Sequence, residues 1–201
     1  ALDYYSRTLK LDTNHIRARL NRCSIHMAMG EGRKALDDAE ILLDLAPNFT
    51  LARFRKAEAE MMLNEWSRAR EDLDVVLEKA PHHHQALTQL AACFIALERP
   101  ERAETPLNEA LRIAPDYAPA WHQRGLLYLE WGRNDNAMSD FEAAVKADTQ
   151  HLDSRLHIAA MHHEAEQFDL AATAWRSVLQ IDSDNLVAKT RLDECEVKLM
   201  A

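Results

Sequence analysis

The stretch APAWHQRGLLYLEWGRNDNAMSDFEAAVKADTQH, residues 118–151, carries the pattern that decides the fold. Its second half places four apolar residues at the i, i+4, i+7 and i+8 spacing of one helical stripe: Ala137, Phe141, Ala144 and Val145. A second apolar set lies within residues 120–131. Gly132 can end a helix, and Asn134 and Asp135 are candidate N-caps for the next one. The stretch therefore predicts two antiparallel helices joined by a short turn.

Alanine recurs along the chain at a spacing of 34 residues: Ala1, Ala35, Ala69, Ala103, Ala137 and Ala171. Two further registers share this spacing, one aliphatic and one small: Leu9, Leu43, Leu77, Leu111, Val145 and Leu179, and Cys23, Ala57, Ala91, Gly125 and Ala159. Small residues let two helices approach closely, and the aliphatic residue fills the seam. A fourth register holds prolines that end one helix before the next begins: Pro47, Pro81 and Pro115. The period predicts a stack of helix pairs.

These residues resemble the tetratricopeptide repeat family. The clearest unit, 118–151, matches the family signature at seven positions: Trp121, Gly125, Tyr128, Gly132, Ala137, Phe141 and Ala144. The resemblance covers the whole chain and implies an all-α fold, a right-handed superhelical solenoid of antiparallel helix pairs that forms one domain over residues 1–201. We expect five full repeats, at 16–49, 50–83, 84–117, 118–151 and 152–185.

The two ends of the sequence fall outside the full repeats. Residues 1–15 match the second helix of a truncated repeat, and residues 186–201 match a terminal helix. Because the sequence starts within a repeat, we expect a fragment of a longer protein.

Two features depart from the family signature. Arg19, Arg53 and Arg155 occupy the position that Trp121 fills in the clearest repeat. Pro106 falls inside an expected helix at 101–113, where an interior proline costs about 3 kcal/mol. We therefore predict a kink or a late helix start at Pro106.

Composition narrows the possible function. The net charge of −9 argues against nucleic acid, because nucleic-acid proteins concentrate Lys and Arg on one face. No apolar run approaches the roughly 20 residues of a membrane helix, so we expect no membrane insertion. Cys23, Cys93 and Cys195 are too few and too far apart for a disulfide framework, which fits a reducing compartment. A cytoplasmic location is the default expectation.

In the family, the first helix of each repeat lines a concave groove. Carried over to this sequence, the resemblance implies that the following residues face a bound peptide: Arg17, Leu20, Asn21, Ser24, Leu51, Phe54, Arg55, Glu58, Gln85, Thr88, Gln89, His122, Gln123, Leu126 and His157. This mixture of cations, amides and apolar residues suits either an extended segment or a partner helix.

One branch of the family grips the acidic C-terminal tails of chaperones with lysine, asparagine and arginine. Asn21 and Arg55 match two of those clamp positions, but Leu51 stands where that branch has a lysine. The sequence therefore holds no complete clamp. The alternative for Arg55 is a solvated arginine that forms surface ion pairs.

Catalytic and metal sites are not expected. The histidines at 82–84 lie in a loop, and His157, His162 and His163 lack the spacing of three or four that helical ligand pairs use. No phosphate-binding glycine loop, dinucleotide turn or zinc-protease helix occurs, and the cysteines have no C-x-x-C partner. We expect no enzyme activity, no cofactor and no metal.

Three functions are consistent with the sequence. The leading hypothesis is a protein-interaction module whose groove binds a peptide or helical segment within a scaffold, co-chaperone or assembly factor. The second is a structural spacer or self-association element, although a homo-oligomer is not itself predicted. The third is a non-catalytic repeat domain attached to an enzyme.

Overall fold

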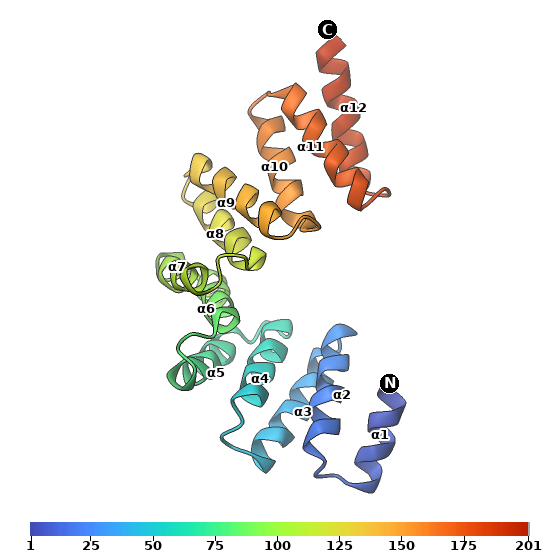
Figure 1. The fold of residues 1–201 in the computed structure, drawn as a ribbon, viewed down its shortest axis with the longest axis vertical. Coiled ribbons are helices and arrows are strands. Elements are labelled where there is room, and N and C mark those ends of the chain that lie inside the picture. Colours follow the sequence, from blue (N-terminus) through green and yellow to red (C-terminus); the bar gives the residue numbers. More distant parts are fainter. Residues whose placement is uncertain (201) are drawn as a thin grey trace. The chain divides into compact units, whose positions relative to one another are not determined.

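The computed structural model describes residues 1–200, whose regular structure is helical with no strand (Figure 1). The chain divides into two compact units between Pro106 and Leu107. The first unit contains α1 (Leu2–Leu11), α2 (Ile16–Ala28), α3 (Gly32–Leu45), α4 (Thr50–Met62), α5 (Trp66–Lys79), α6 (His84–Ala96) and the short 3-10 helix Pro100–Arg102. The predicted all-α class is confirmed.

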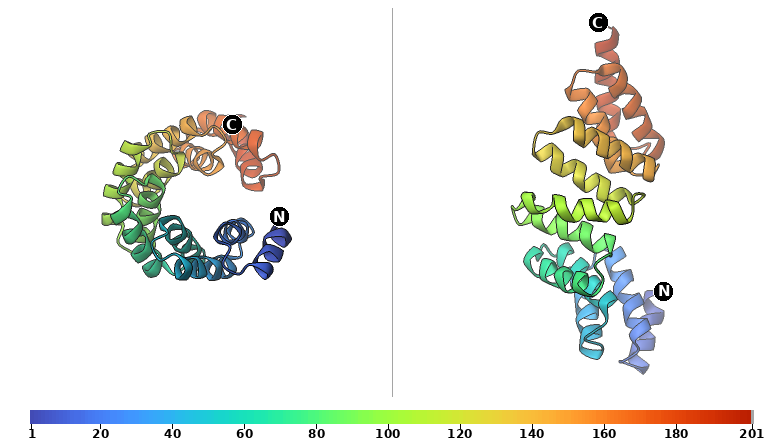
Figure 2. Two further views of the ribbon diagram at one scale, coloured as in Figure 1. Left: turned by 60° about the horizontal axis from the view of Figure 1, so that its bottom comes forward. Right: turned by 60° about the vertical axis from the view of Figure 1, so that its left-hand side comes forward.

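The second unit begins within α7 (Glu104–Ile113), which crosses the boundary. It continues with α8 (Ala118–Glu130), α9 (Asn134–Ala147), α10 (Leu152–Glu164), α11 (Phe168–Ile181) and α12 (Leu186–Met200). Both views of Figure 2 show consecutive helices of each unit stacked side by side. First helices of neighbouring repeats also meet, α2 against α4 and α4 against α6 in the first unit, and α10 against α12 in the second.

The small-residue registers form the seams between helices. The alanines of the main register are fully buried from the second one onward: Ala35, Ala69, Ala103, Ala137 and Ala171. A Cβ on Gly125 would lie 2.7 Å from Phe141 Cε1, so only a hydrogen atom fits between α8 and α9 there. Close approach of the helices thus depends on the absence of side-chain volume at these positions.

The turn inside each repeat uses one left-handed residue at a fixed register. Gly30 and Gly132 have φ of 73° and 68°, and Asn64, Glu98 and Glu166 have φ of 57° to 60° at the equivalent positions. Non-glycine residues in this region cost about 1–2 kcal/mol, so packing of the flanking helices must hold them there.

The predicted N-caps of α9 are wrong. Its N-cap residue is Arg133, which makes no capping side-chain hydrogen bond, and Asn134 and Asp135 lie inside the first turn. The left-handed Gly132 sets the helix start one residue earlier than the cap chemistry suggested. Asp135 still favours the helix, because a carboxylate in the first turn complements the positive end of the helix dipole.

The late helix start predicted at Pro106 is confirmed. Residues 100–102 form the 3-10 helix, in which the Arg102 and Ala103 N–H groups donate three residues back. The α-helix α7 begins only at Glu104, so Pro106 lies in its first turn. No intrahelical hydrogen bond is lost there, because the first N–H groups of a helix have no partner within it.

In the first unit, the arginines that replace tryptophan at the register of Trp121 bind buried aspartates. Arg19 donates to Asp38 Oδ1 at 3.0 Å, and Arg53 donates to Asp72 Oδ1 at 2.6 Å. Both aspartates are buried between the two helices of their repeat. The arginine therefore neutralises a buried carboxylate that would otherwise be costly.

Glu60 is a buried carboxylate with incomplete pairing. Its side chain is 1% exposed, and Lys56 Nζ lies 3.0 Å from its Oε1 while also binding Asp72 Oδ2 at 2.5 Å. The second oxygen, Oε2, has no hydrogen-bond partner. Burial raises the pKa of Glu60 to about 7, against the opposing effect of Lys56.

We expect Glu60→Gln to stabilise the protein at alkaline pH. A folded-state pKa above the unfolded value means that the contribution of Glu60 is fully present below about pH 4.5 and is lost as pH rises to about 7. Glutamine keeps the shape without the charge, so the free energy of unfolding at pH 8 should rise by about 1–2 kcal/mol. Chemical denaturation between pH 5 and pH 8 measures this, with the exposed Glu71→Gln as control. A variant less stable than the parent at pH 8 would contradict the assignment.

Candidate functional site

The first helices of three repeats form one face of the first unit. α2, α4 and α6 lie next to one another, and we call their outward residues the first-helix face. Among the predicted groove residues on this face, some are exposed and others half-buried: Arg17, Asn21, Leu51 and Gln85 in the first group, and Leu20, Ser24, Arg55, Glu58 and Gln89 in the second. The structure thus brings nine of the predicted residues together on three adjacent helices.

A hydrogen-bonded chain crosses this face. Arg55 donates to Glu58 Oε2 at 2.5 Å, and Gln89 Nε2 on α6 donates to Glu58 Oε1 at 2.9 Å. Arg55 Nε and Gln89 Oε1 are buried atoms that have no hydrogen-bond partner. The network therefore retains one unused donor and one unused acceptor on neighbouring helices.

Asn21 is held by a residue that the sequence did not single out. Its Nδ2 donates to the Tyr5 hydroxyl on α1 at 3.2 Å, and the Tyr5 ring meets Tyr4 edge to face. Tyr5 lies on the second helix of the incomplete repeat and shares the 34-residue register of Leu73, Leu107 and Phe141, which indicates a packing residue and not a groove residue. Only the packing of α1 against α2 shows the contact.

Three predicted groove residues offer little surface to a ligand. Phe54, Thr88 and His122 are all buried. The Phe54 ring lies 4.6 Å from that of His83, and Thr88 Oγ1 donates to the His84 carbonyl within its own helix. Their role in lining an open groove is therefore corrected to one in packing.

In the second unit, His122 sits at the centre of an aromatic cluster. Its ring centroid lies 5.0 Å from that of His151, 5.4 Å from that of His157 and 5.6 Å from that of Phe141. His122 Nδ1 is 3.0 Å from Ser154 Oγ on α10. Burial, with the neighbouring His151 and His157, lowers the pKa of His122 to about 4.

The remaining predicted residues of the second unit are half-buried. Gln123 and Leu126 lie on α8, and His157 on α10 stacks on the Phe141 ring at 4.8 Å. Burial also lowers the pKa of His157.

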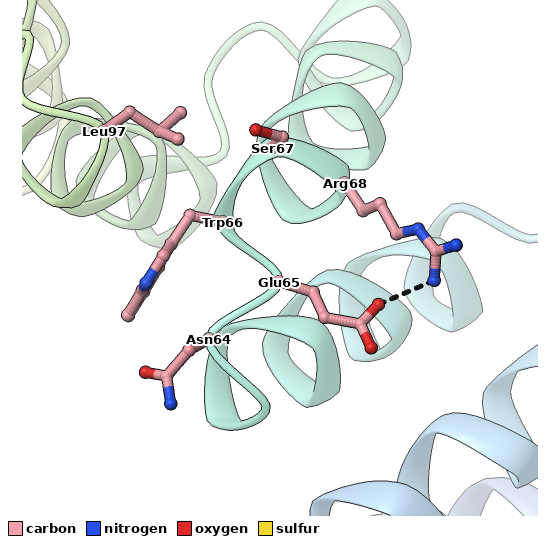
Figure 3. A pocket seen from close by; sticks show the side chains of 6 residues that line it. All are labelled: Asn64, Glu65, Trp66, Ser67, Arg68 and Leu97. Carbon is pink, nitrogen blue, oxygen red and sulfur yellow. Dashed lines mark hydrogen bonds and ion pairs between the residues drawn. The ribbon is translucent and has the colours of Figure 1, made fainter.

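A hollow at the α4–α5 turn adds a residue that sequence reasoning missed. Asn64, Trp66 and Leu97 line a space of about 460 Å³, and Figure 3 shows Arg68 turned away from Trp66 toward Glu65. Trp66 is the first residue of α5, a position outside the recurring registers, so no periodic signal marked it. A half-buried tryptophan at a turn can anchor a partner side chain.

The sequence matches known protein families. Three family models described as tetratricopeptide repeat match residues 20–83, 61–124 and 118–151, and together they span residues 20–151. The chain belongs to the tetratricopeptide repeat family. Tetratricopeptide repeats form protein–protein interaction modules, and this chain is a module of that general kind. A search of curated protein sequences gives no match.

Solved structures of tetratricopeptide repeat proteins share the fold. TTC0263, a thermophilic protein of Thermus thermophilus, is 23% identical with a TM-score of 0.77, over 90% of this chain and 99% of that one. A chain of the APC/C hetero-tetramer Cut9–Hcn1 is 17% identical with a TM-score of 0.84, over 96% of this chain and 39% of that one. YrrB, described as having an unusual peptide-binding site, is 18% identical with a TM-score of 0.60, over 94% of this chain and 98% of that one. At these identities the likeness establishes the fold, and the predicted tetratricopeptide solenoid class is confirmed.

The carboxylate clamp of the chaperone-binding branch is incomplete in this tetratricopeptide repeat protein. Arg55 already pairs with Glu58, and Leu51 at the lysine position is an exposed aliphatic residue. A ligand carboxylate would have to displace Glu58 from Arg55. The face is therefore better matched to groups that join the network than to an acidic tail.

Several histidines cap helices. His15, His83 and His151 each accept, through Nδ1, the N–H three residues further on. No group of three or more His, Cys, Asp or Glu residues within residues 1–200 could hold a metal ion. Burial raises the pKa of the Cys23 and Cys93 thiols to about 12, so neither is a ready nucleophile.

Over residues 1–200, none of the helices is both long enough and apolar enough to cross a bilayer.

The histidine cluster should make the second unit sensitive to acid. The depressed pKa of His122 means that its neutral form is favoured in the folded state, so stability is full above about pH 6.5 and falls as pH drops toward 4. We expect protonation of His122 to lower the free energy of unfolding by about 2–3 kcal/mol between pH 7 and pH 4. His122→Asn should flatten that part of the denaturation-against-pH curve, whereas the exposed His82→Asn should not. Equal slopes in the parent and His122→Asn would refute the assignment.

Proposed function

We propose that the first-helix face of α2, α4 and α6 binds an extended peptide segment of a partner protein, within a scaffold, co-chaperone or assembly factor. The observation that carries the proposal is the Arg55–Glu58–Gln89 chain, which spans two helices and keeps an unused donor and acceptor. A peptide group offers one C=O and one N–H. It can therefore complete the network after small rotations of the two side chains.

The surroundings of this network suit a peptide. Asn21 and Gln85 are exposed amides on the flanking helices α2 and α6, and Arg17 is an exposed cation on α2. Leu51 is 39% exposed and supplies an apolar contact between them. Side-chain amides can hydrogen-bond to a peptide backbone while an apolar position selects a side chain. The peptide-binding site named for YrrB, which has the same fold, is consistent with this use.

We expect Arg55→Ala to weaken binding of the partner segment by about tenfold or more, because it removes a donor from the network and leaves Glu58 half-satisfied. Arg112→Ala is the matched control, since Arg112 forms an i, i+3 pair with Glu109 on α7. Fluorescence anisotropy with the segment recovered by crosslinking measures both affinities. Equal losses in the two variants would show that the face is not the site.

Photo-crosslinking tests the face directly. A benzoylphenylalanine replacing Arg17 or Gln85 should crosslink to the partner in an extract of the source cells. The same group replacing the exposed Glu40 on α3 or Glu71 on α5 should not. Crosslinks from the second-helix positions alone would reject the proposed face in favour of the opposite side.

Self-association is a second candidate, favoured by the surface of α12. Leu186, Val187, Val197 and Met200 are each more than half exposed. Apolar side chains gathered on one helix favour burial against another surface. If α12 serves this purpose, light scattering should give a mass that rises with concentration, and Val197→Asp should return it to the monomer value. A constant monomer mass for the unaltered chain would exclude this candidate.

A further inference from the structure

Comparison of the repeats with one another reveals a missing carboxylate. A basic residue on the first helix binds a buried aspartate sixteen positions later in three repeats: Arg22 with Asp38, Lys56 with Asp72, and Arg124 with Asp140. Repeat 84–117 has Leu90 and Pro106 at these two positions, and repeat 152–185 has Ile158 and Ala174. Repeat 152–185 therefore lacks both the cation and the aspartate of the seam.

The second basic residue of the seam is nevertheless present. Arg155 occupies the register of Arg19 and Arg53, which bind Asp38 and Asp72. Arg155 donates twice to the Thr149 carbonyl, at 3.2 Å from Nε and 2.8 Å from Nη2, as Arg19 donates to the Thr13 carbonyl, but with alanine at 174 it lacks the aspartate that Arg19 also binds. No carboxylate in the described chain lies within ion-pair distance of it. Its charge is thus uncompensated where two other repeats place an aspartate.

A cavity opens where the seam is depleted. It measures about 240 Å³ and lies among α9, α10 and α11 of the second unit. Four of its eight lining residues are apolar, Val145, Ile158, Leu170 and Ala174, and four are polar, Arg155, His162, Thr173 and Ser177. Leu170 is 53% exposed, so the apolar lining extends to the surface. None of these residues belongs to the groove set expected from the sequence.

We propose that this cavity is a second docking site, which takes a partner segment carrying an apolar side chain next to an aspartate or glutamate. The apolar side chain fills the space between Ile158 and Ala174, where its burial is favourable. The carboxylate pairs with the Arg155 guanidinium and takes the place of the absent aspartate. Arginine suits this role because its planar fork can bind a carboxylate through two hydrogen bonds.

The charge of the second unit limits the kind of partner. Residues 107–201 contain 9 basic and 16 acidic side chains, so a run of acidic residues would be repelled. A single carboxylate is different, because its pairing with Arg155 acts at contact distance, whereas repulsion from dispersed surface charges is screened beyond about 8 Å. The site therefore fits one acidic residue within an otherwise apolar segment.

Three variants of the full chain test the site. Ala174→Asp supplies the aspartate internally, fills part of the cavity and gives Arg155 the partner that Arg19 and Arg53 have. Arg155→Gln removes the charge but keeps a donor for the Thr149 carbonyl. Arg176→Gln is the control, because Arg176 is a neighbouring surface arginine on α11 that pairs with Glu196. Circular dichroism establishes that each variant is folded.

The probe is a phage-displayed library of random dodecapeptides, panned on the unaltered chain and counter-selected on Ala174→Asp. We expect enrichment of peptides with Leu, Ile, Met or Phe beside Asp or Glu. Affinity of the best peptide should fall about tenfold or more in Ala174→Asp and Arg155→Gln, and stay within about twofold in Arg176→Gln and Arg55→Ala. Retained binding in Arg55→Ala separates this site from the first-helix face.

Three results would overturn the proposal. The first is a selection that enriches no peptide, and the second is one that enriches peptides without an acidic residue. The third is an enriched peptide whose affinity is unchanged in Arg155→Gln. If Ala174→Asp fails to fold, counter-selection on Arg155→Gln and the Arg155→Gln affinity decide the matter.

Discussion

Each helix of this protein packs against its neighbours at small side chains, and the rest of the structure depends on that close approach. Ala35, Ala69, Ala137 and Ala171 are completely buried, and Gly125 leaves only enough room for the Phe141 ring. A pair of helices cannot bury both of its apolar faces alone, so stability is shared between neighbouring repeats. Substituting larger residues at these seams would separate helices that the remaining contacts hold together.

The seams also determine where charge can be buried. In repeats 16–49, 50–83 and 118–151 the space beside the small residues holds an aspartate with a basic partner from the facing helix. Repeat 152–185 keeps the packing but replaces this pair with Ile158 and Ala174. In this repeat a cavity lies beside the two positions that hold an ion pair in the other three. Variation at these positions can create a binding site without altering the fold.

Buried titratable groups are present in both units. Glu60, desolvated in the first unit, holds its proton more tightly than a free carboxyl group does. His122, desolvated in the second unit among His151 and His157, loses its proton more readily than a free imidazole does. In both cases burial penalises the charged form. Ionisation of Glu60 at alkaline pH therefore destabilises the folded state, as does protonation of His122 at acid pH.

The sequence by itself determined the helical class, the 34-residue period and the late start of α7, because these follow from spacing and from backbone restrictions that act locally. It also placed Arg55, Glu58 and Gln89 on first helices, although not in one hydrogen-bonded chain. Tertiary structure alone decided that Arg19 and Arg53 neutralise buried aspartates nineteen residues away, and that His122 is buried beside Ser154. Such pairings depend on rotamers and on the separation of packed helices, which no local pattern encodes. For the same reason the cavity beside Arg155 is set by the packing of α9, α10 and α11 and not by a local pattern.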